Sequence, residues 1–188
     1  LCDEIRFMAT PPVDGALVES VVYPAEYVYK LPDNLSFAEG ALIEPLAVGI
    51  HATKIAEVES GDRIAILGSG PIGLVTLQAA RAKGATEAIA VDINDFRLNL
   101  AEKLGATRLI KAKEEDVCQR VKELTKNKGV DIVFETAGTA ITTRQTVEIV
   151  KKGGTIVLIG LGSQDVIPLN TVKLIWKEIR IQCIQRYA

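Results

Sequence analysis

The sequence lacks the marks of several protein classes. Its three cysteines, Cys2, Cys118 and Cys183, are widely spaced and form no CxxC pair, which excludes a visible disulfide framework or closed zinc knuckle. No apolar run approaches the ~20 residues of a membrane span. No basic run accompanies the net charge of −2, which argues against a nucleic-acid partner. The start is polar and resembles no signal peptide, so a reducing, cytoplasmic setting is expected. The absence of an initiator Met predicts a segment of a longer chain.

The composition is that of a globular protein, with 188 residues of which 48% are hydrophobic and 24% charged. Before residue 60 the chain is rich in proline and glycine breakers, and two runs between them, Ala16–Tyr23 and Tyr27–Lys30, predict a β-hairpin or meander. Ser36 and Glu39 then form an S-x-x-E capping box. Pro45 marks the expected start of a second helix.

After residue 60, short apolar runs alternate regularly with helical patterns. The expected strands are Arg63–Leu67, Glu87–Ile93, Arg108–Lys111, Val130–Phe134, Thr155–Gly160 and Ile179–Gln185. The expected helices are Ile72–Lys83, Phe96–Leu104, Glu114–Lys126, Thr139–Val150 and Thr171–Lys177. Strands that are apolar throughout are typical of a parallel sheet covered on both faces. The pattern therefore predicts an α/β fold with a doubly wound, six-stranded parallel sheet of the Rossmann type.

One motif in this region has the spacing of a dinucleotide-binding turn. Residues 68–73 read G-x-G-x-x-G, between an apolar strand and a helix. Gly68 would permit the tight turn, Gly70 would let the backbone approach a pyrophosphate, and Gly73 would let the helix pack closely on the strand. The N–H groups at the start of the helix would face the phosphates. The alternative, that these glycines serve only as turn residues, is less favoured in this context.

An acidic residue stands where such a turn requires one. Asp92 ends the second expected strand, 19 residues after Gly73, and would accept hydrogen bonds from the adenosine ribose. Its charge would repel a 2′-phosphate, so NAD is the expected cofactor. Arg97 lies close enough in sequence to accommodate NADP, but beside Asp92 it is expected to cover the adenine or to cap the following helix. The alternative for Asp92 is a solvated acid at the start of a loop.

Glycines also follow the fourth and fifth expected strands, at the point where the strand order should reverse. The fourth strand ends Phe134-Glu135-Thr136-Ala137-Gly138 and the fifth ends Ile159-Gly160-Leu161-Gly162. Simple turn chemistry explains each glycine separately. Their joint position beneath the expected crevice favours space for the nicotinamide half of the cofactor.

Three stretches carry a resemblance to a known family. Residues 40–52 read GALIEPLAVGIHA, with ATPPVDG at 9–15 before them and the glycine motif after them. Together with Leu161-Gly162-Ser163 and Arg186-Tyr187, they resemble the zinc-dependent polyol branch of the medium-chain dehydrogenases, most closely its sorbitol (L-iditol) dehydrogenases. The resemblance implies that residues 46–188 form an NAD-binding Rossmann domain. It implies that residues 1–45 are the trailing part of a β-rich, GroES-like catalytic domain.

The resemblance implies a reaction in which zinc acts as a Lewis acid while a polyol is oxidised to a ketose by hydride transfer to NAD. Glu44 matches the family position beside the metal, either as a ligand or by holding its water. A buried carboxylate is costly without a positive partner, which zinc would supply. Glu44 could instead simply favour the N-terminus of the helix begun by Pro45, and the residues alone leave these two interpretations about even.

The other residues that match the family's functional positions are assigned one by one. At the cofactor, the resemblance matches Val48, Gly68, Gly70, Ile72, Gly73, Asp92, Arg97, Ile159, Gly160, Leu161, Ile184, Gln185 and Arg186. At the substrate it matches Phe7, Glu44, Arg186 and Tyr187. Val48 and Phe7 could instead be core residues, and Arg186 and Tyr187 could be polar residues that end an edge strand. His51 is interpreted as structural or as an accessory to a proton relay.

The sequence departs from the family in its metal ligands. The family's ligating cysteine and His-Glu pair, and its four-cysteine structural zinc lobe, have no counterpart here and are expected before Leu1. This segment is therefore expected to bind NAD without holding the catalytic zinc. The last strand, 179–185, is expected to pair with another subunit in a dimer or tetramer. Alternatives are a threonine or butanediol dehydrogenase, or a dinucleotide-binding module without catalysis.

Overall fold

The computed structural model of the chain describes residues 5–162 and 164–187, so the predictions that concern Cys2 and Ser163 fall outside the described residues. The chain divides into two compact units, one that ends at Ala41 and one from Leu42 to Tyr187. The sequence instead suggested a boundary after residue 45. The functions expected for the two parts of the chain stay predictions.

The first unit does not form the strands expected for it. Residues 16–23 and 27–30 are irregular and largely exposed, and a short 3₁₀ helix, η1 (Ala25–Tyr27), interrupts them. A strand requires a neighbour that accepts and donates its backbone hydrogen bonds. No such neighbour pairs with these runs among the residues that the structure describes, so the prediction of a hairpin or meander is wrong.

Helix α1 (Phe37–Ile55) begins at the expected capping box but does not stop at Pro45. The Glu39 N–H donates to Ser36 Oγ at 3.2 Å, and the Ser36 N–H donates to Glu39 Oε2 at 2.8 Å. Pro45 lies inside the helix, so the expectation of a second helix starting there is wrong. Proline removes one backbone hydrogen bond. The helix continues beyond it because its later turns bury Val48 and Ala52.

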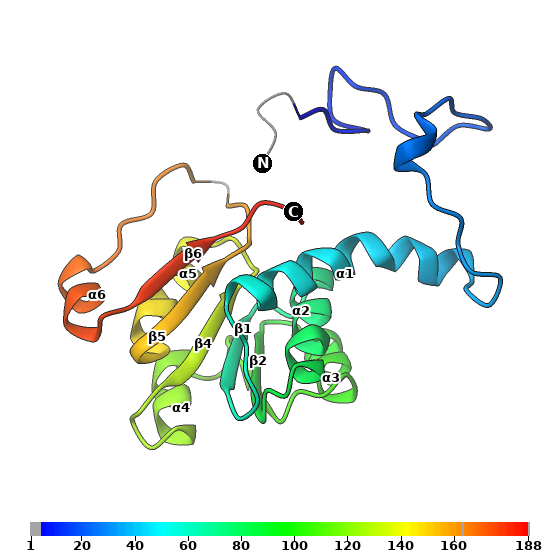
Figure 1. The fold of residues 1–188 in the computed structure, drawn as a ribbon. Helices are drawn as coiled ribbons and strands as arrows, with labels where there is room; N and C mark the ends of the chain where they lie inside the picture. Colours follow the sequence, from blue (N-terminus) through cyan, green and yellow to red (C-terminus); the bar gives the residue numbers. More distant parts are fainter. Residues whose placement is uncertain (1–4, 163, 188) are drawn as a thin grey trace. The chain divides into compact units, whose positions relative to one another are not determined.

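The second unit contains the predicted parallel sheet. Its strands are β1 (Arg63–Leu67), β2 (Glu87–Asp92), β3 (Arg108–Lys111), β4 (Val130–Glu135), β5 (Val150–Leu158) and β6 (Arg180–Cys183). Their order is β3-β2-β1-β4-β5-β6, and every neighbouring pair is parallel (Figure 1). This order confirms the doubly wound α/β prediction and places the reversal of strand order between β1 and β4. Strand β5 starts earlier, and β6 ends earlier, than the sequence predicted.

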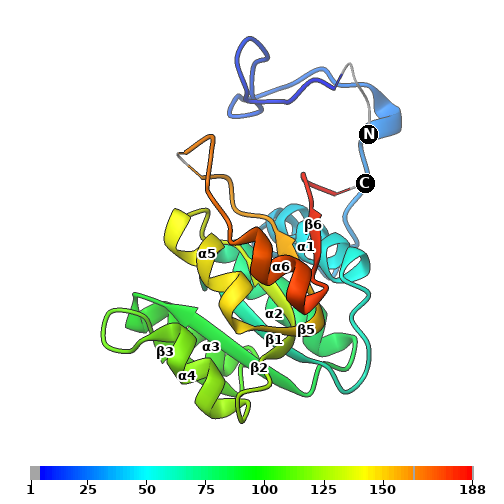
Figure 2. The ribbon, with the colours of Figure 1, turned by 90° about the vertical axis from the view of Figure 1, so that its left-hand side faces the viewer.

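Helices cover both faces of this sheet. Besides α1 they are α2 (Pro71–Ala82), α3 (Asp95–Lys103), α4 (Val117–Leu124), α5 (Ala140–Ile149) and α6 (Thr171–Lys177). Helices α1, α2 and α3 pack on one face, and α4, α5 and α6 on the other (Figures 1 and 2). Among the described residues, no helix is both long and apolar enough to cross a membrane.

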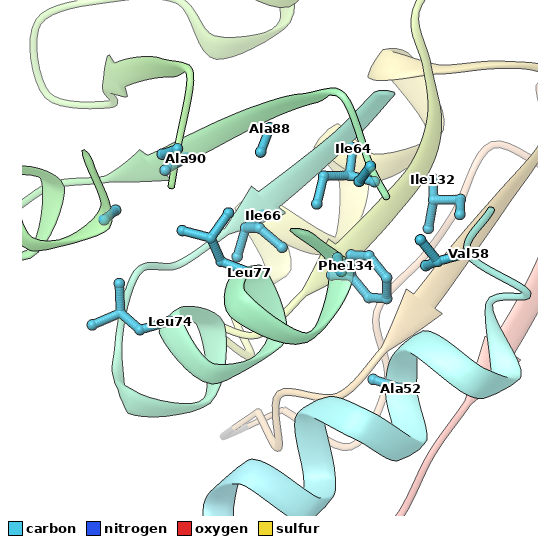
Figure 3. Close-up of a cluster of buried hydrophobic side chains, with 14 of the residues drawn as sticks. Ala52, Val58, Ile64, Ile66, Leu74, Leu77, Ala88, Ala90, Ile132 and Phe134 are labelled. Atoms are coloured by element: carbon cyan, nitrogen blue, oxygen red, sulfur yellow. The ribbon is translucent and has the colours of Figure 1, made fainter. Parts of the chain in front are cut away.

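The core forms two layers because successive strand residues point to opposite faces. Ile64 and Ile66 of β1 face the α1–α3 layer, whereas Ala65 and Leu67 face the α4–α6 layer. Phe134 is the largest fully buried side chain and lies against α2 and α1 in the first layer (Figure 3). Burial of such a side chain contributes about 1.5–3 kcal/mol. Both layers together hold the carboxyl ends of β1, β2 and β4 in fixed positions.

Candidate functional site

The turn after β1 uses glycine where a side chain would strain the backbone or clash. Gly68 has a φ of 101°, in the left-handed region that glycine adopts readily. At Gly73, in the first turn of α2, an added methyl carbon would lie 1.9 Å from the Gly68 carbonyl oxygen. Gly70 instead has open space around its Cα and precedes Pro71 at the start of the helix. The predicted strand, turn and helix context of the motif is confirmed.

Asp92 ends β2 beside this turn, because β1 and β2 are parallel neighbours with Leu67 opposite Val91. Its side chain is buried and accepts two backbone hydrogen bonds. Oδ2 accepts from the Ser69 N–H at 2.8 Å, and Oδ1 accepts from the Asn94 N–H at 2.9 Å. A carboxylate offers roughly four acceptor positions, so Asp92 can tie the two segments together and still accept hydrogen bonds from a ligand.

Arg97 reaches toward Asp92 from α3. Its guanidinium Nη1 lies 3.7 Å from Asp92 Oδ2, and half of its side chain is exposed. The cap of this helix is a different residue, because the Asn94 side chain accepts hydrogen bonds from the Phe96 and Arg97 N–H groups. The suggestion that Arg97 caps the helix is therefore wrong. The guanidinium group of Arg97 instead lies beside the Asp92 carboxylate as a neighbouring positive charge.

A cleft of about 510 Å³ opens at the carboxyl ends of the strands. It is lined by Gly68, Gly70, Val91, Asp92, Ile93, Arg97, Ala112, Thr136, Ala137, Thr139, Ile141, Thr142 and Gln145. These residues follow β1, β2, β3 and β4, so the cleft lies where the strand order reverses, as ligand sites do in open α/β sheets. It brings together four of the residues that the sequence singled out, namely Gly68, Gly70, Asp92 and Arg97.

No role was predicted from the sequence for Glu135, which ends β4 and is 1% exposed. Its Oε1 accepts hydrogen bonds from the Ala137 N–H at 3.0 Å, the Gly138 N–H at 2.9 Å and the Thr142 hydroxyl at 2.7 Å. Burial raises the pKa of this carboxyl group, against the opposing effect of these hydrogen bonds. Glu135 thus shapes the turn that forms one wall of the cleft, much as Asp92 shapes the opposite wall.

Thr136 joins that turn to the glycine turn. Its hydroxyl donates to the Gly68 carbonyl oxygen at 2.7 Å, and its N–H donates to the Leu67 carbonyl oxygen at 3.0 Å. The contact links residues 68 positions apart in the sequence. The available signal was a carboxylate followed by a threonine at the end of an apolar strand, which is the same kind of position that drew attention to Asp92.

The other residues expected at the cofactor lie on neighbouring elements. Val48 is buried in α1, and Ile72 is half-buried in the first turn of α2. The N–H groups of Ile159 and Gly160 donate to the Glu135 carbonyl oxygen at 2.9 and 3.0 Å, which holds the end of β5 against β4. Ile184 packs with Ile159 against the α1–α3 core layer.

Leu161 and Gln185 are exposed. Neither these residues nor Val48, Ile72, Ile159, Gly160 and Ile184 line the cleft described above. Their roles at a cofactor remain predictions.

Two of the residues expected at the substrate meet. The carboxylate of Glu44 lies close enough to the hydroxyl of Tyr187 to affect its pKa. Burial, together with this negative charge, raises the pKa of Tyr187. Glu44 is exposed and lies well inside α1. Its expected burial and the alternative placement at a helix N-terminus are therefore both wrong for the described chain. Arg186 is half-buried, with a φ of 66°.

The described residues contain no group of three or more His, Cys, Asp or Glu side chains placed to hold a metal ion. Cys118 is half-buried and Cys183 exposed, and both are free thiols. Burial raises the pKa of Cys118. His51 lies near the end of α1, and its buried Nδ1 has no hydrogen-bond partner within the described part of the chain. Phe7 belongs to the first unit, and its role at a substrate remains a prediction.

The burial of the Glu135 carboxyl group predicts how the stability of the protein depends on pH. Because its folded pKa is raised above 4.5, its contribution to stability is complete below that pH and declines as the pH rises through the raised pKa. Glu135→Gln keeps an oxygen acceptor and has no such dependence. We expect the free energy of unfolding of the variant, relative to the wild type, to increase as the pH rises above 4.5. Urea denaturation measures it, with Glu102→Gln as the control for loss of an exposed charge. A flat difference would contradict this account of Glu135.

Comparison with known proteins connects this geometry with a family. The family model for zinc-binding dehydrogenases matches residues 71–188. Sorbitol dehydrogenase from Bacillus subtilis is 43% identical over 188 residues, which are 100% of this chain and 53% of that protein. An Escherichia coli oxidoreductase of unknown specificity is 46% identical with a TM-score of 0.94, over 100% of this chain and 54% of that one.

A Sinorhizobium meliloti protein, assigned as a zinc-binding dehydrogenase and solved with NADP bound, is 32% identical with a TM-score of 0.87. The match covers 93% of this chain and 52% of that chain. The chain spans about half the length of these relatives. It belongs to the zinc-binding dehydrogenase family, the medium-chain dehydrogenases that its sequence resembles.

Proposed function

We propose that the second unit binds NAD in the cleft between the glycine turn and the end of β4. The observation that carries this proposal is the 2.8 Å hydrogen bond from the Ser69 N–H to Asp92 Oδ2. It fixes the carboxylate that we assign to the ribose beside a turn that suits a pyrophosphate. The family's members are typically nicotinamide-dependent, in agreement with this assignment.

Each wall of the cleft has its own task in this proposal. The first N–H groups of α2, which have no partner within the helix, donate to the pyrophosphate that approaches over Gly70. Asp92 accepts hydrogen bonds from the ribose hydroxyls through its free acceptor positions. Ile93 and Arg97 border the adenine. The turn held by Glu135 and residues 159–161, which follow β5, border the nicotinamide, with Val48 behind it.

Bound NAD would accept a hydride from the carbon of a secondary alcohol. The family also implies zinc, but the donor set of the described residues does not fit a catalytic zinc ion, since it includes no cluster of three ligands. Glu44 is the single position matched to the family's metal site. We therefore derive no step through zinc from this chain, and we assign Glu44 and Tyr187 to holding a substrate hydroxyl.

The substrate class proposed for the complete enzyme is a polyol that is oxidised to a ketose. Its support is the 43% identity to a sorbitol dehydrogenase and the pairing of Tyr187 with Glu44. In this proposal Arg186 completes the contacts to the polyol, and the role of Phe7 stays a prediction. Ile184 and Gln185 directly precede Arg186 in the chain, and in this proposal they contact the cofactor. A cytoplasmic location remains a prediction from composition.

Strand β6 supports a further part of the proposal. It forms one edge of the sheet, and most of its residues are exposed. An open edge offers unpaired backbone groups to another strand. We assign this edge, within residues 179–185, to pairing with a second copy of the chain. Light scattering at micromolar concentration should give the mass of a dimer or tetramer, and a monomer alone would contradict this assignment.

Gly70→Ala tests cofactor binding separately from folding. Gly70 has a φ of −73° and no atom within 4 Å of an added methyl carbon, so the variant should fold with its stability changed by less than about 0.5 kcal/mol. The methyl group would nevertheless lie where the pyrophosphate approaches. We expect NADH to bind at least about tenfold more weakly, measured by fluorescence titration.

Gly73→Ala is the contrasting variant, because its methyl carbon would meet the Gly68 carbonyl oxygen and should destabilise the fold. Wild-type affinity in Gly70→Ala would rule out the proposed pyrophosphate position. In the same titration NADPH should bind more weakly than NADH, since Asp92 repels a 2′-phosphate. Tighter NADPH binding would show that Arg97 outweighs Asp92.

Steady-state rates of the complete gene product test the substrate class. With NAD, kcat/KM for sorbitol or xylitol should exceed that for butanediol or threonine by at least about tenfold, a transition-state difference of roughly 1.4 kcal/mol. Tyr187→Phe should lower the polyol values, because it removes the hydroxyl that faces Glu44, while leaving NADH affinity unchanged. Absence of polyol turnover would exclude the proposed substrate while leaving NAD binding intact.

A further inference from the structure

A second hollow, of about 300 Å³, is lined by residues of α4, α5, β5 and α6. Figure 2 shows these helices on one face of the sheet. The hollow opens at the amino-terminal ends of β4 and β5, whereas the cofactor cleft lies at the carboxyl ends of the strands. Five lysines line it, and we call it the lysine pocket: Lys122, Lys128, Lys152, Lys173 and Lys177. They come from α4, the loop after it, β5 and α6. Glu148 is the one carboxylate that lines it within the described residues.

Two of these lysines already have partners. The ammonium group of Lys173 lies 2.5 Å from Glu148 Oε1, an ion pair between α6 and α5. Lys177 donates to the carbonyl oxygens of Val147 and Val150, both at 2.8 Å, and so covers the carboxyl end of α5. Burial lowers the pKa of Lys177, and the neighbouring positive charges add to this effect. These two lysines, together with Glu148, thus form a fixed wall of the pocket.

The other three, Lys122, Lys128 and Lys152, have exposed side chains and form no ion pair with any described residue. Like charges that converge on one hollow repel each other. Composition does not explain the gathering, because the chain as a whole carries a net charge of −2. A hollow lined by one sign of charge attracts and concentrates ions of the opposite sign. A bound multivalent anion would therefore balance the positive charge of these lysines.

We propose that the lysine pocket binds a phosphate-type anion, with Lys122, Lys128 and Lys152 as its ligands. A volume of about 300 Å³ equals roughly ten water molecules at about 30 Å³ each. A phosphate or diphosphate group fits this space with part of its hydration. Ammonium groups bind such oxyanions through charge-assisted hydrogen bonds. The site does not depend on the cofactor cleft, since no residue lines both hollows.

The test is a titration of the chain with inorganic pyrophosphate at constant ionic strength, followed by the backbone amide resonances in NMR. We expect saturable shifts at residues 127–129 and 150–152 that sodium chloride at the same ionic strength does not produce. Replacing Lys122, Lys128 and Lys152 together by Gln should weaken this binding at least about tenfold. All three side chains are exposed, so the variant should fold.

The matched control replaces Lys54, Lys103 and Lys113 by Gln, which removes the same charge from exposed positions outside the pocket. Its pyrophosphate affinity should equal that of the wild type. If both triple variants lost the same affinity for pyrophosphate, the binding would reflect the overall charge of the chain and not the lysine pocket. That result would overturn the proposal. Shifts confined to residues 68–73 would assign all binding to the cofactor cleft, which would also overturn it.

Discussion

The hydrogen bond from the Ser69 N–H to Asp92 Oδ2 joins the end of β2 to the turn that follows β1. It exists because β1 and β2 are parallel neighbours in register, so that their carboxyl ends emerge side by side. The same carboxylate holds the Asn94 N–H at the start of α3. One buried acid thereby fixes a phosphate-sized turn, a helix start and its own position toward the cleft. Without it the two strands would still pair and the Gly68 N–H would still donate to the Val91 carbonyl oxygen at 2.9 Å, but the Ser69 and Asn94 N–H groups would lose their acceptor.

Glu135 repeats this arrangement on the other side of the cleft. It also ends a buried strand and accepts backbone N–H groups of the turn that follows, and Thr136 links that turn back to Gly68. The two carboxylates differ in environment. Asp92 has a cation 3.7 Å away, whereas burial raises the pKa of Glu135, which has no ion pair within the described chain. Asp92 therefore suits a ligand that is recognised through its hydroxyl groups, and Glu135 suits a structural role beside the reacting end of the cofactor.

The second unit was predictable because local patterns and the global fold agree in it. Strands β1, β2 and β4 are largely buried apolar runs, α2 and α3 are followed within two residues by Gly84 and Gly105, and the glycine motif has its acidic partner at the usual spacing. The first unit was not predictable in this way, because the runs at 16–23 and 27–30 have strand-like composition but no partner strand in the described chain. Pro45 misled for a related reason, since the packing of Val48 and Ala52 maintains α1 beyond it. The role of Thr136 could not be read from sequence, because it arises from a contact with a turn 68 positions away.

The central claim is that Asp92 and the glycine turn hold one dinucleotide between them. A crystal structure of the chain with NADH tests it most directly. The account predicts the adenosine ribose within hydrogen-bonding distance of Asp92 and the pyrophosphate over Gly70 at the start of α2. Electron density for NADH elsewhere on the molecule, or an empty cleft at saturating NADH, would contradict it.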